Sequence, residues 1–265
     1  MPKSASTVLV ETRGNVALVT LNRPENQNTI DLQMAMDLLA AAMTCSRNNT
    51  VRAVVLTGAG RNFSFGGDLR AIASEGAESA YLRELTGYLH LAISHFVRMD
   101  PPVLAAVNGT AAGAGVGLAA MADLALCAKS SKFNLAYTAA GLTPDGGTSF
   151  FLPRVLGTRR SMELLLLNKP LLAKQALDWG LVNEVVDDED LVERAMEIAG
   201  QLGDGATGAF GQTKRLVAHS LGALESHMTL ESETIAAQAA SVDGIEGIRA
   251  FLEKRKPGFS GNGTR

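Results

Sequence analysis

The feature that most constrains the fold is an alternation of short apolar runs with longer segments of helical period. Strand-like apolar runs occur at residues 51–58 (VRAVVLTG), 102–109 (PVLAAVNG) and 123–128 (DLALCA). Between them, apolar residues recur every three or four positions over residues 30–45 and 82–96. Strands separated by helices pair in parallel through crossover connections. The chain is therefore predicted to be an α/β protein built on a mainly parallel sheet.

The helical segments also predict which residues face the core. In the first segment the apolar stripe consists of Leu32, Met36, Leu39, Ala40 and Met43. In the second it consists of Leu82, Leu85, Leu89, Ile93 and Phe96. Ahead of both, two strand-like runs, TVLVE and VALVTLN, flank the turn Arg13-Gly14-Asn15 and predict a β-hairpin.

The pattern changes beyond about residue 157, where helical periods dominate and only LVNEVV (181–186) reads as a strand. Residues 1–200 are predicted to form the layered α/β core. Residues 201–265 are predicted to form a C-terminal helical region, because helical periods continue there. No low-complexity linker separates this region from the core, so we expect it to pack on its own core or on a neighbouring subunit.

Composition excludes several classes of function. The net charge is −3 with lysine and arginine dispersed, which argues against nucleic-acid binding. No signal peptide or membrane-spanning run is visible, so we expect a cytoplasmic protein with no membrane partner. Cys45 and Cys127 lie in apolar runs and are expected to be reduced thiols. The histidines show no metal-ligand spacing, so we expect no metal.

Three glycine-containing segments stand at strand or helix ends, at residues 64–69 (SFGGDL), 108–117 (NGTAAGAGVG) and 141–149 (GLTPDGGTS). Phosphate binding is the first reading of such loops. None of them ends in the Gly-Lys-Ser/Thr of a Walker loop, and the third glycine of a dinucleotide fingerprint is absent. Two explanations for these glycines stay open. They could expose backbone amides that donate to a developing oxyanion, or they could only permit positive φ or close packing.

Six stretches follow one another along the chain: LNRPENQNT, VVLTGAGRNFSFGGDLR, NGTAAGAGVGLAAMADLAL, GLTPDGGTSFFLPRVLG, DWGLVNEVVDDEDL and AFLEKRKPGF. In this order they resemble the motifs of the crotonase superfamily of enoyl-CoA hydratases and isomerases. The resemblance implies a crotonase-like spiral of ββα units, a C-terminal region for trimerisation and coenzyme A capping, and a homotrimer or dimer of trimers. It also implies acyl-CoA thioester substrates and no separate cofactor.

The resemblance further implies an oxyanion hole made by the backbone amides of Gly67 and Ala114. Hydratases of the family use two glutamates, but this chain has Gly117 and Tyr137 at the matching positions. Neither residue can replace a carboxylate base at neutral pH, so hydration is disfavoured. The remaining acid is Asp145, which could alternatively act as a turn residue or helix N-cap.

The run around Asp145 is similar to the isomerase branch that includes ring-epoxide isomerases of aromatic CoA esters. The resemblance implies that Asp145 moves a proton between C2 and C4 of the acyl chain. A dehalogenase-like alternative makes Asp145 a nucleophile and His90 a base, although His90 could equally be a half-buried structural residue. A non-catalytic binding member is the third alternative.

Further contacts are implied for the two parts of the substrate. Residues expected to bind coenzyme A are Arg23, Phe65, Asp68, Leu69, Phe251 and Lys254, of which Phe251 and Lys254 match residues that reach the adenine and 3′-phosphate. Phe65 could also be a packing residue, and Asp68 could fix the turn. Candidates for the acyl pocket are Leu82, His90, Tyr137, Leu142 and Phe150.

Overall fold

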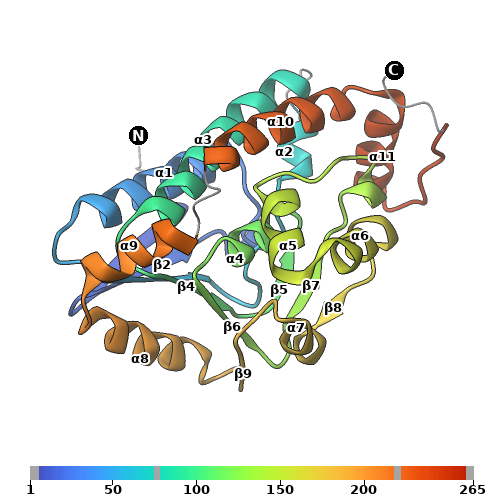
Figure 1. Ribbon diagram of the computed structural model, residues 1–265. Helices are drawn as coiled ribbons and strands as arrows, with labels where there is room; N and C mark the ends of the chain where they lie inside the picture. The colour runs from blue at the N-terminus through green and yellow to red at the C-terminus, as the bar shows by residue number, and fades with distance from the viewer. Residues whose placement is uncertain (1–5, 75–77, 218–221, 261–265) are drawn as a thin grey trace.

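The structure is a computed structural model that describes residues 6–74, 78–217 and 222–260 (Figure 1). The predicted α/β class is correct. Two sheets stand at the centre, with helices around them. Within the described ranges, no helix is both long and apolar enough to cross a bilayer.

The larger sheet has six strands in the order β1-β2-β3-β4-β6-β9. The predicted N-terminal hairpin is confirmed, because β1 and β2 pair antiparallel around Gly14, whose φ is +62°. All other neighbours in this sheet pair in parallel, as predicted. The strands are β1 (Val8–Arg13), β2 (Val16–Leu21), β3 (Ala53–Gly58), β4 (Val103–Val107), β6 (Leu124–Ala128) and β9 (Glu184–Val186).

The smaller sheet joins β5 (Thr110–Ala112), β7 (Lys132–Asn134) and β8 (Leu171–Leu172). β5 directly follows β4, so the chain leaves the larger sheet at residues 108–109 and enters the smaller one. β5 pairs in parallel with β7, and β7 pairs antiparallel with β8. The glycine segment 108–117 therefore lies at the point where the chain passes between the two sheets.

Helix α1 (Leu32–Arg47) begins where Asp31 accepts a hydrogen bond from the amide of Met34 at 2.8 Å. The helix was predicted correctly, but its buried face was not. The buried residues are Met34, Ala35, Leu38, Ala41, Ala42 and Cys45. The predicted stripe is half-buried or exposed, and Met36 is 40% exposed. Small alanines and methionines occur on both sides of this helix, so the spacing alone does not select a face.

Helix α3 (Glu78–Arg98) buries all five residues of its predicted stripe. On its outer side it packs against α10 (Gly222–Ala239), so the two long helices run alongside each other (Figure 1). His90 is buried beside the stripe. This helix pair closes the molecule over the ends of the strands that carry the glycine segments.

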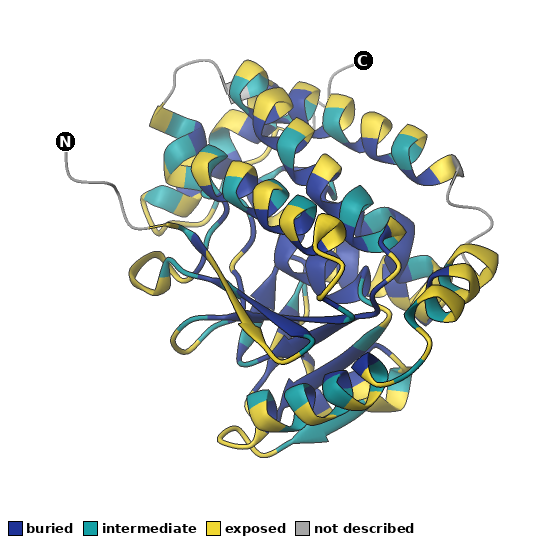
Figure 2. Cartoon of the chain, turned by 90° about the vertical axis from the view of Figure 1, so that its left-hand side faces the viewer, coloured by how far each residue is buried: buried dark blue, intermediate teal, exposed yellow. Residues whose placement is uncertain are grey.

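Helix α8 (Leu191–Gly203) covers the opposite face of the larger sheet and forms a separate small core there (Figure 2). The division predicted at residue 200 falls inside this helix. From residue 204 onwards the described elements are all helical. The remaining helices are α2 (Leu69–Ser74), α4 (Ala114–Ala120), α5 (Thr148–Leu156), α6 (Thr158–Leu167), α7 (Ala173–Trp179), α9 (Thr207–Val217) and α11 (Val242–Leu252), with short 3-10 turns at η1 (Pro24–Asn26) and η2 (Thr138–Ala140).

Candidate active site

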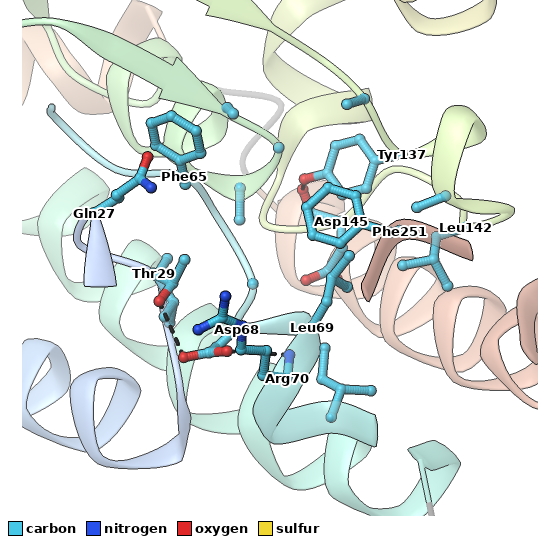
Figure 3. A pocket seen from close by; sticks show the side chains of 18 of the residues that line it. Gln27, Thr29, Phe65, Asp68, Leu69, Arg70, Tyr137, Leu142, Asp145 and Phe251 are labelled. Carbon is cyan, nitrogen blue, oxygen red and sulfur yellow. Dashed lines mark hydrogen bonds between the residues drawn. The ribbon is translucent and has the colours of Figure 1, made fainter. Parts of the chain in front are cut away.

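A cavity of about 540 Å³ lies between the loop that follows β3, the start of α4 and the turn before α5. Gly67, Ala114 and Asp145 all line it. Figure 3 shows Phe65 and Gln27 on one side of the cavity, with Tyr137 and Leu142 on the other. The three glycine segments, which are distant in sequence, therefore meet in one cavity.

Gly66 explains why two of these segments touch. Its φ is +73°, and a Cβ added there would lie 2.6 Å from the carbonyl oxygen of Ala112 and 2.9 Å from the amide nitrogen of Ala114. Its carbonyl accepts a hydrogen bond from the amide of Ile30 at 2.7 Å. Only glycine fits this conformation and this close approach. Gly66 therefore holds the β3 loop against the start of α4.

Gly67 differs from its neighbour. A Cβ there would meet only the Cδ1 of Ile72 at 3.8 Å, which is an ordinary contact. Among the described residues, neither the Gly67 amide nor the Ala114 amide has a hydrogen-bond partner. Ala114 is the first residue of α4, so its N–H points out of the helix. Two residues of the cavity lining thus carry unpaired main-chain donors.

Asp145 does not act as the N-cap of α5. Gly147 occupies that position, with φ +72° and no side-chain cap. The turn that carries Asp145 is held instead by Tyr137, whose hydroxyl donates to the Asp145 carbonyl at 2.8 Å. Burial raises the pKa of Tyr137 well above its usual value, with a further rise from the Asp145 charge, so this hydroxyl stays a donor.

The Asp145 carboxylate is buried, and its Oδ1 lies 2.9 Å from Nε2 of His90. Burial lowers the pKa of His90, but the charge and hydrogen bond of Asp145, with a smaller effect of Glu231, outweigh it and raise the pKa overall. Among the described residues, no hydrogen bond reaches Oδ2 of Asp145. His90 thus holds one carboxylate oxygen, and the other is unpaired on a residue that lines the cavity.

Glu231 of α10 is a third ionisable group that sequence reasoning missed. It is 4% exposed and accepts hydrogen bonds from the amides of Gly147 at 2.7 Å and Ser149 at 3.0 Å. Burial, and next the charge of Asp145, raise the pKa of Glu231 to about 7, although the hydrogen bonds it accepts oppose the rise. Glu231 therefore ties α10 to the turn that carries Asp145.

Ligand atoms of His90, Asp145 and Glu231 all lie within 4.8 Å of one another. A donor set of one imidazole and two carboxylates resembles those that hold divalent cations. Here, however, His90 is bonded to Asp145, and both oxygens of Glu231 accept main-chain hydrogen bonds. The arrangement matches an acid–base cluster, and the expectation that the protein needs no metal stays a prediction.

The two positions that match hydratase glutamates, 117 and 137, are both engaged in contacts with the turn that carries Asp145. A Cβ at Gly117 would clash with the carbonyl oxygen of Gly146 and lie 2.9 Å from Oγ1 of Thr148. The hydroxyl of Tyr137 donates its hydrogen bond to the carbonyl of Asp145. There is accordingly no room for a glutamate at position 117 in this conformation.

The residues expected to bind coenzyme A fall into two groups. Phe65, Asp68, Leu69 and Phe251 line the cavity. Arg23 does not, because its guanidinium contacts Asp31 at 3.0 Å and Asp68 at 3.3 Å. Lys254 is exposed and also outside the lining. Asp68 also accepts from the amide of Arg70, so it fixes the turn into α2.

Among the acyl-pocket candidates, Leu82, Tyr137 and Leu142 line the cavity. His90 and Phe150 do not, which corrects that part of the prediction. His90 lies behind Asp145, and the ring of Phe150 packs edge-on against those of Phe151 and His227. Sequence reasoning missed the apolar wall residues Leu89 of α3 and Ile235 of α10.

Comparisons with known proteins identify the family of the chain. The model of the family "Enoyl-CoA hydratase/isomerase" matches residues 11–262. The chain therefore belongs to the enoyl-CoA hydratase/isomerase family. Its structure superposes with a TM-score of 0.87 on an enoyl-CoA hydratase from Mycobacterium avium subsp. paratuberculosis K-10, at 29% identity, covering 97% of this chain and 100% of that one.

Curated relatives with different names are about equally similar. A 1,2-epoxyphenylacetyl-CoA isomerase of Escherichia coli K12 is 36% identical over 96% of this chain and 98% of its own length. A 4-chlorobenzoyl coenzyme A dehalogenase-2 of an Arthrobacter species is 36% identical over 93% and 91%. A probable enoyl-CoA hydratase of Rhodobacter capsulatus is 38% identical over 97% and 99%. Identity alone does not separate the reactions.

Proposed function

We propose that the protein is an acyl-CoA isomerase that moves a double bond or opens a ring epoxide through a thioester enolate. The observation that carries the proposal is a single buried carboxylate, Asp145, in the same cavity as the unpaired amides of Gly67 and Ala114. The E. coli relative named 1,2-epoxyphenylacetyl-CoA isomerase supports the same class of substrate.

In the proposed reaction the two amides donate hydrogen bonds to the thioester oxygen and stabilise its negative charge as the enolate forms. Such a donor contributes roughly 3–4 kcal/mol of transition-state stabilisation. Asp145 takes a proton from C2 through its free Oδ2 and returns it at C4 in double-bond isomerisation. His90 holds Oδ1, so the carboxylate keeps one orientation during both transfers.

Hydration is disfavoured because it needs a group that activates water and a second that delivers a proton. The cavity lining contains Asp145 together with the residues that carry the two amides. At position 117 the Gly146 carbonyl leaves no room for a side chain, and the Tyr137 hydroxyl donates to the carbonyl of Asp145. Of the other acids of the lining, Glu25 is exposed and Asp68 pairs with Arg23.

A second candidate is the dehalogenase type of reaction. The 2.9 Å contact between His90 and Asp145 favours it, since that chemistry uses a carboxylate nucleophile and a histidine base. One feature ranks it second. His90 contacts Asp145 but is not part of the cavity lining.

The test is a panel of 3-enoyl-CoA, 2-enoyl-CoA, the ring epoxide of phenylacetyl-CoA and 4-chlorobenzoyl-CoA, offered to the wild type and to Asp145→Asn. We expect isomerisation of a 3-enoyl-CoA or of the epoxide, lowered by about 10²–10⁴-fold in the variant. Rapid hydration of 2-enoyl-CoA would overturn the assignment. Halide release from the chlorobenzoyl ester would favour the second candidate.

A matched control for this test is Asp178→Asn, which changes an exposed acid on α7 outside the cavity lining. It removes the same charge and should leave every activity in the panel unchanged.

The same panel also tests the expectation that the protein needs no cofactor. Turnover should occur with only the enzyme and the coenzyme A ester in the reaction mixture. The cytoplasmic location and trimeric assembly stay predictions, with sedimentation as the measurement for assembly.

A further inference from the structure

A line of polar contacts leads from the back of the acid cluster towards the surface. Ser149 Oγ donates to Oε1 of Glu231, and the same hydroxyl lies 2.7 Å from Nε2 of His227. His227 stands one helical turn before Glu231 on α10. These three groups take no part in the oxyanion hole or the cavity lining.

Exposure rises along this line. The Glu231 side chain is 4% exposed and that of His227 is 33% exposed, with half-buried Ser149 between them. His227 therefore reaches solvent without lining the cavity. A substrate that fills the cavity would leave His227 open to solvent.

The protonation states suit a relay. Burial, and next the charge of Arg154, lower the pKa of His227, so its imidazole is neutral near pH 7 and can both accept and donate a proton. Glu231 has its pKa raised to about 7 by burial and by Asp145. The charged and titratable groups facing the two residues are His90 of α3, Asp145 before α5 and Arg154 of α5.

We propose that Glu231, Ser149 and His227 form a proton path that connects solvent with the His90–Asp145 pair behind a bound substrate. The proposal rests on Asp145 acting as the proton shuttle. An acid that collects a proton from a bound ester can otherwise only return it to the same ester or wait for the product to leave.

Every step moves only protons and changes no other bond. Protonated Asp145 passes its proton to the Glu231 carboxylate and becomes ionised again. Glu231 then gives the proton to the Ser149 oxygen as that hydroxyl gives its own to Nε2 of His227, and the imidazolium releases a proton to water. Separations up to 4.8 Å within the cluster are short enough for a small side-chain movement or one water molecule to join Glu231 to the pair.

The test uses phenylacetyl-CoA, whose C2 protons exchange with D₂O when the ester is enolised. Exchange of the C2 protons needs the amides and Asp145, which together form the enolate. In addition, the abstracted proton must pass from Asp145 to solvent before it returns to C2. We expect Ser149→Ala to lower C2 exchange, followed by NMR, at least tenfold, whereas isomerisation of the active ester falls much less. Ser149→Thr keeps the hydroxyl and should restore exchange.

His227→Gln is a second variant that interrupts the path at its outer end, and His95→Gln on α3 is its matched control. The proposal is overturned if exchange in Ser149→Ala and His227→Gln equals that of the wild type, or if the wild type isomerises its substrate without any exchange. If the wild type shows neither exchange nor isomerisation, the proposed function itself fails. The two failures are therefore distinguishable.

Discussion

The two sides of the candidate site are built differently. On one side the amides of Gly67 and Ala114 belong to the main chain, and their positions follow from glycines that lie next to them in sequence. On the other side, His90, Asp145 and Glu231 are side chains from three distant segments. The donor side depends on local backbone shape, whereas the acid side depends on how α3 and α10 pack.

Gly117 lies at the contact between the two sides, so a substitution there should have the largest effect. Gly117→Glu would insert the hydratase carboxylate where the Gly146 carbonyl and Thr148 already sit. We expect a loss of about 4 kcal/mol or more in the free energy of unfolding, from overpacking and an unpaired buried charge. Urea denaturation measures it. A stable variant with hydratase activity would show that the turn can move aside.

The next largest effect is expected within the donor side, at two adjacent glycines. Gly66→Ala should cost about 2–4 kcal/mol of unfolding free energy, because φ is +73° and the Cβ would press on Ala112 and Ala114. Gly67→Ala, the matched control, should cost less than about 1 kcal/mol. Equal thermal and chemical stability of the two variants would mean that Gly66 does not hold the loops together.

On the acid side, Glu231 should make stability depend on pH. Its pKa rises from 4.5 unfolded to about 7 folded, so the native state holds the proton more tightly. Its stabilising contribution is complete below about pH 4.5 and is lost as pH rises through about 7, by up to about 3 kcal/mol. Relative to the wild type, Glu231→Gln should therefore become more stable as pH rises from 4.5 to 8. A difference independent of pH in denaturation curves would contradict this.

The smallest expected effect concerns His90. His90→Gln keeps a donor for Asp145 but removes the imidazole, whose pKa is raised beside that carboxylate. We expect kcat for isomerisation to fall about 10–100-fold with KM little changed. The glutamine still orients the Asp145 carboxylate, but the charge that a protonated imidazole can carry is lost. Steady-state kinetics across pH, with His95→Gln as control, measure it. Complete loss of isomerisation would instead assign His90 a direct chemical step.

Much of the fold and half of the site could be predicted from the sequence. The hairpin, the parallel strands and the stripe of α3 follow from periodicity, because a long apolar repeat leaves one buried face. The face of α1 was wrong, since alanine and methionine occur all round that helix. Glu231 gave no signal, because apolar residues of α10 show no single stripe that would mark the inward side.

The sequence by itself determined the backbone: which residues form strands and helices, and where glycine lets two loops approach each other. It did so because these properties depend on neighbours along the chain. Only the tertiary structure decided that His90, 55 residues before Asp145, would bond to it, and that Glu231 would close the cluster from α10. Contacts between side chains so far apart depend on the packing angles and registers of helices, which no local pattern records.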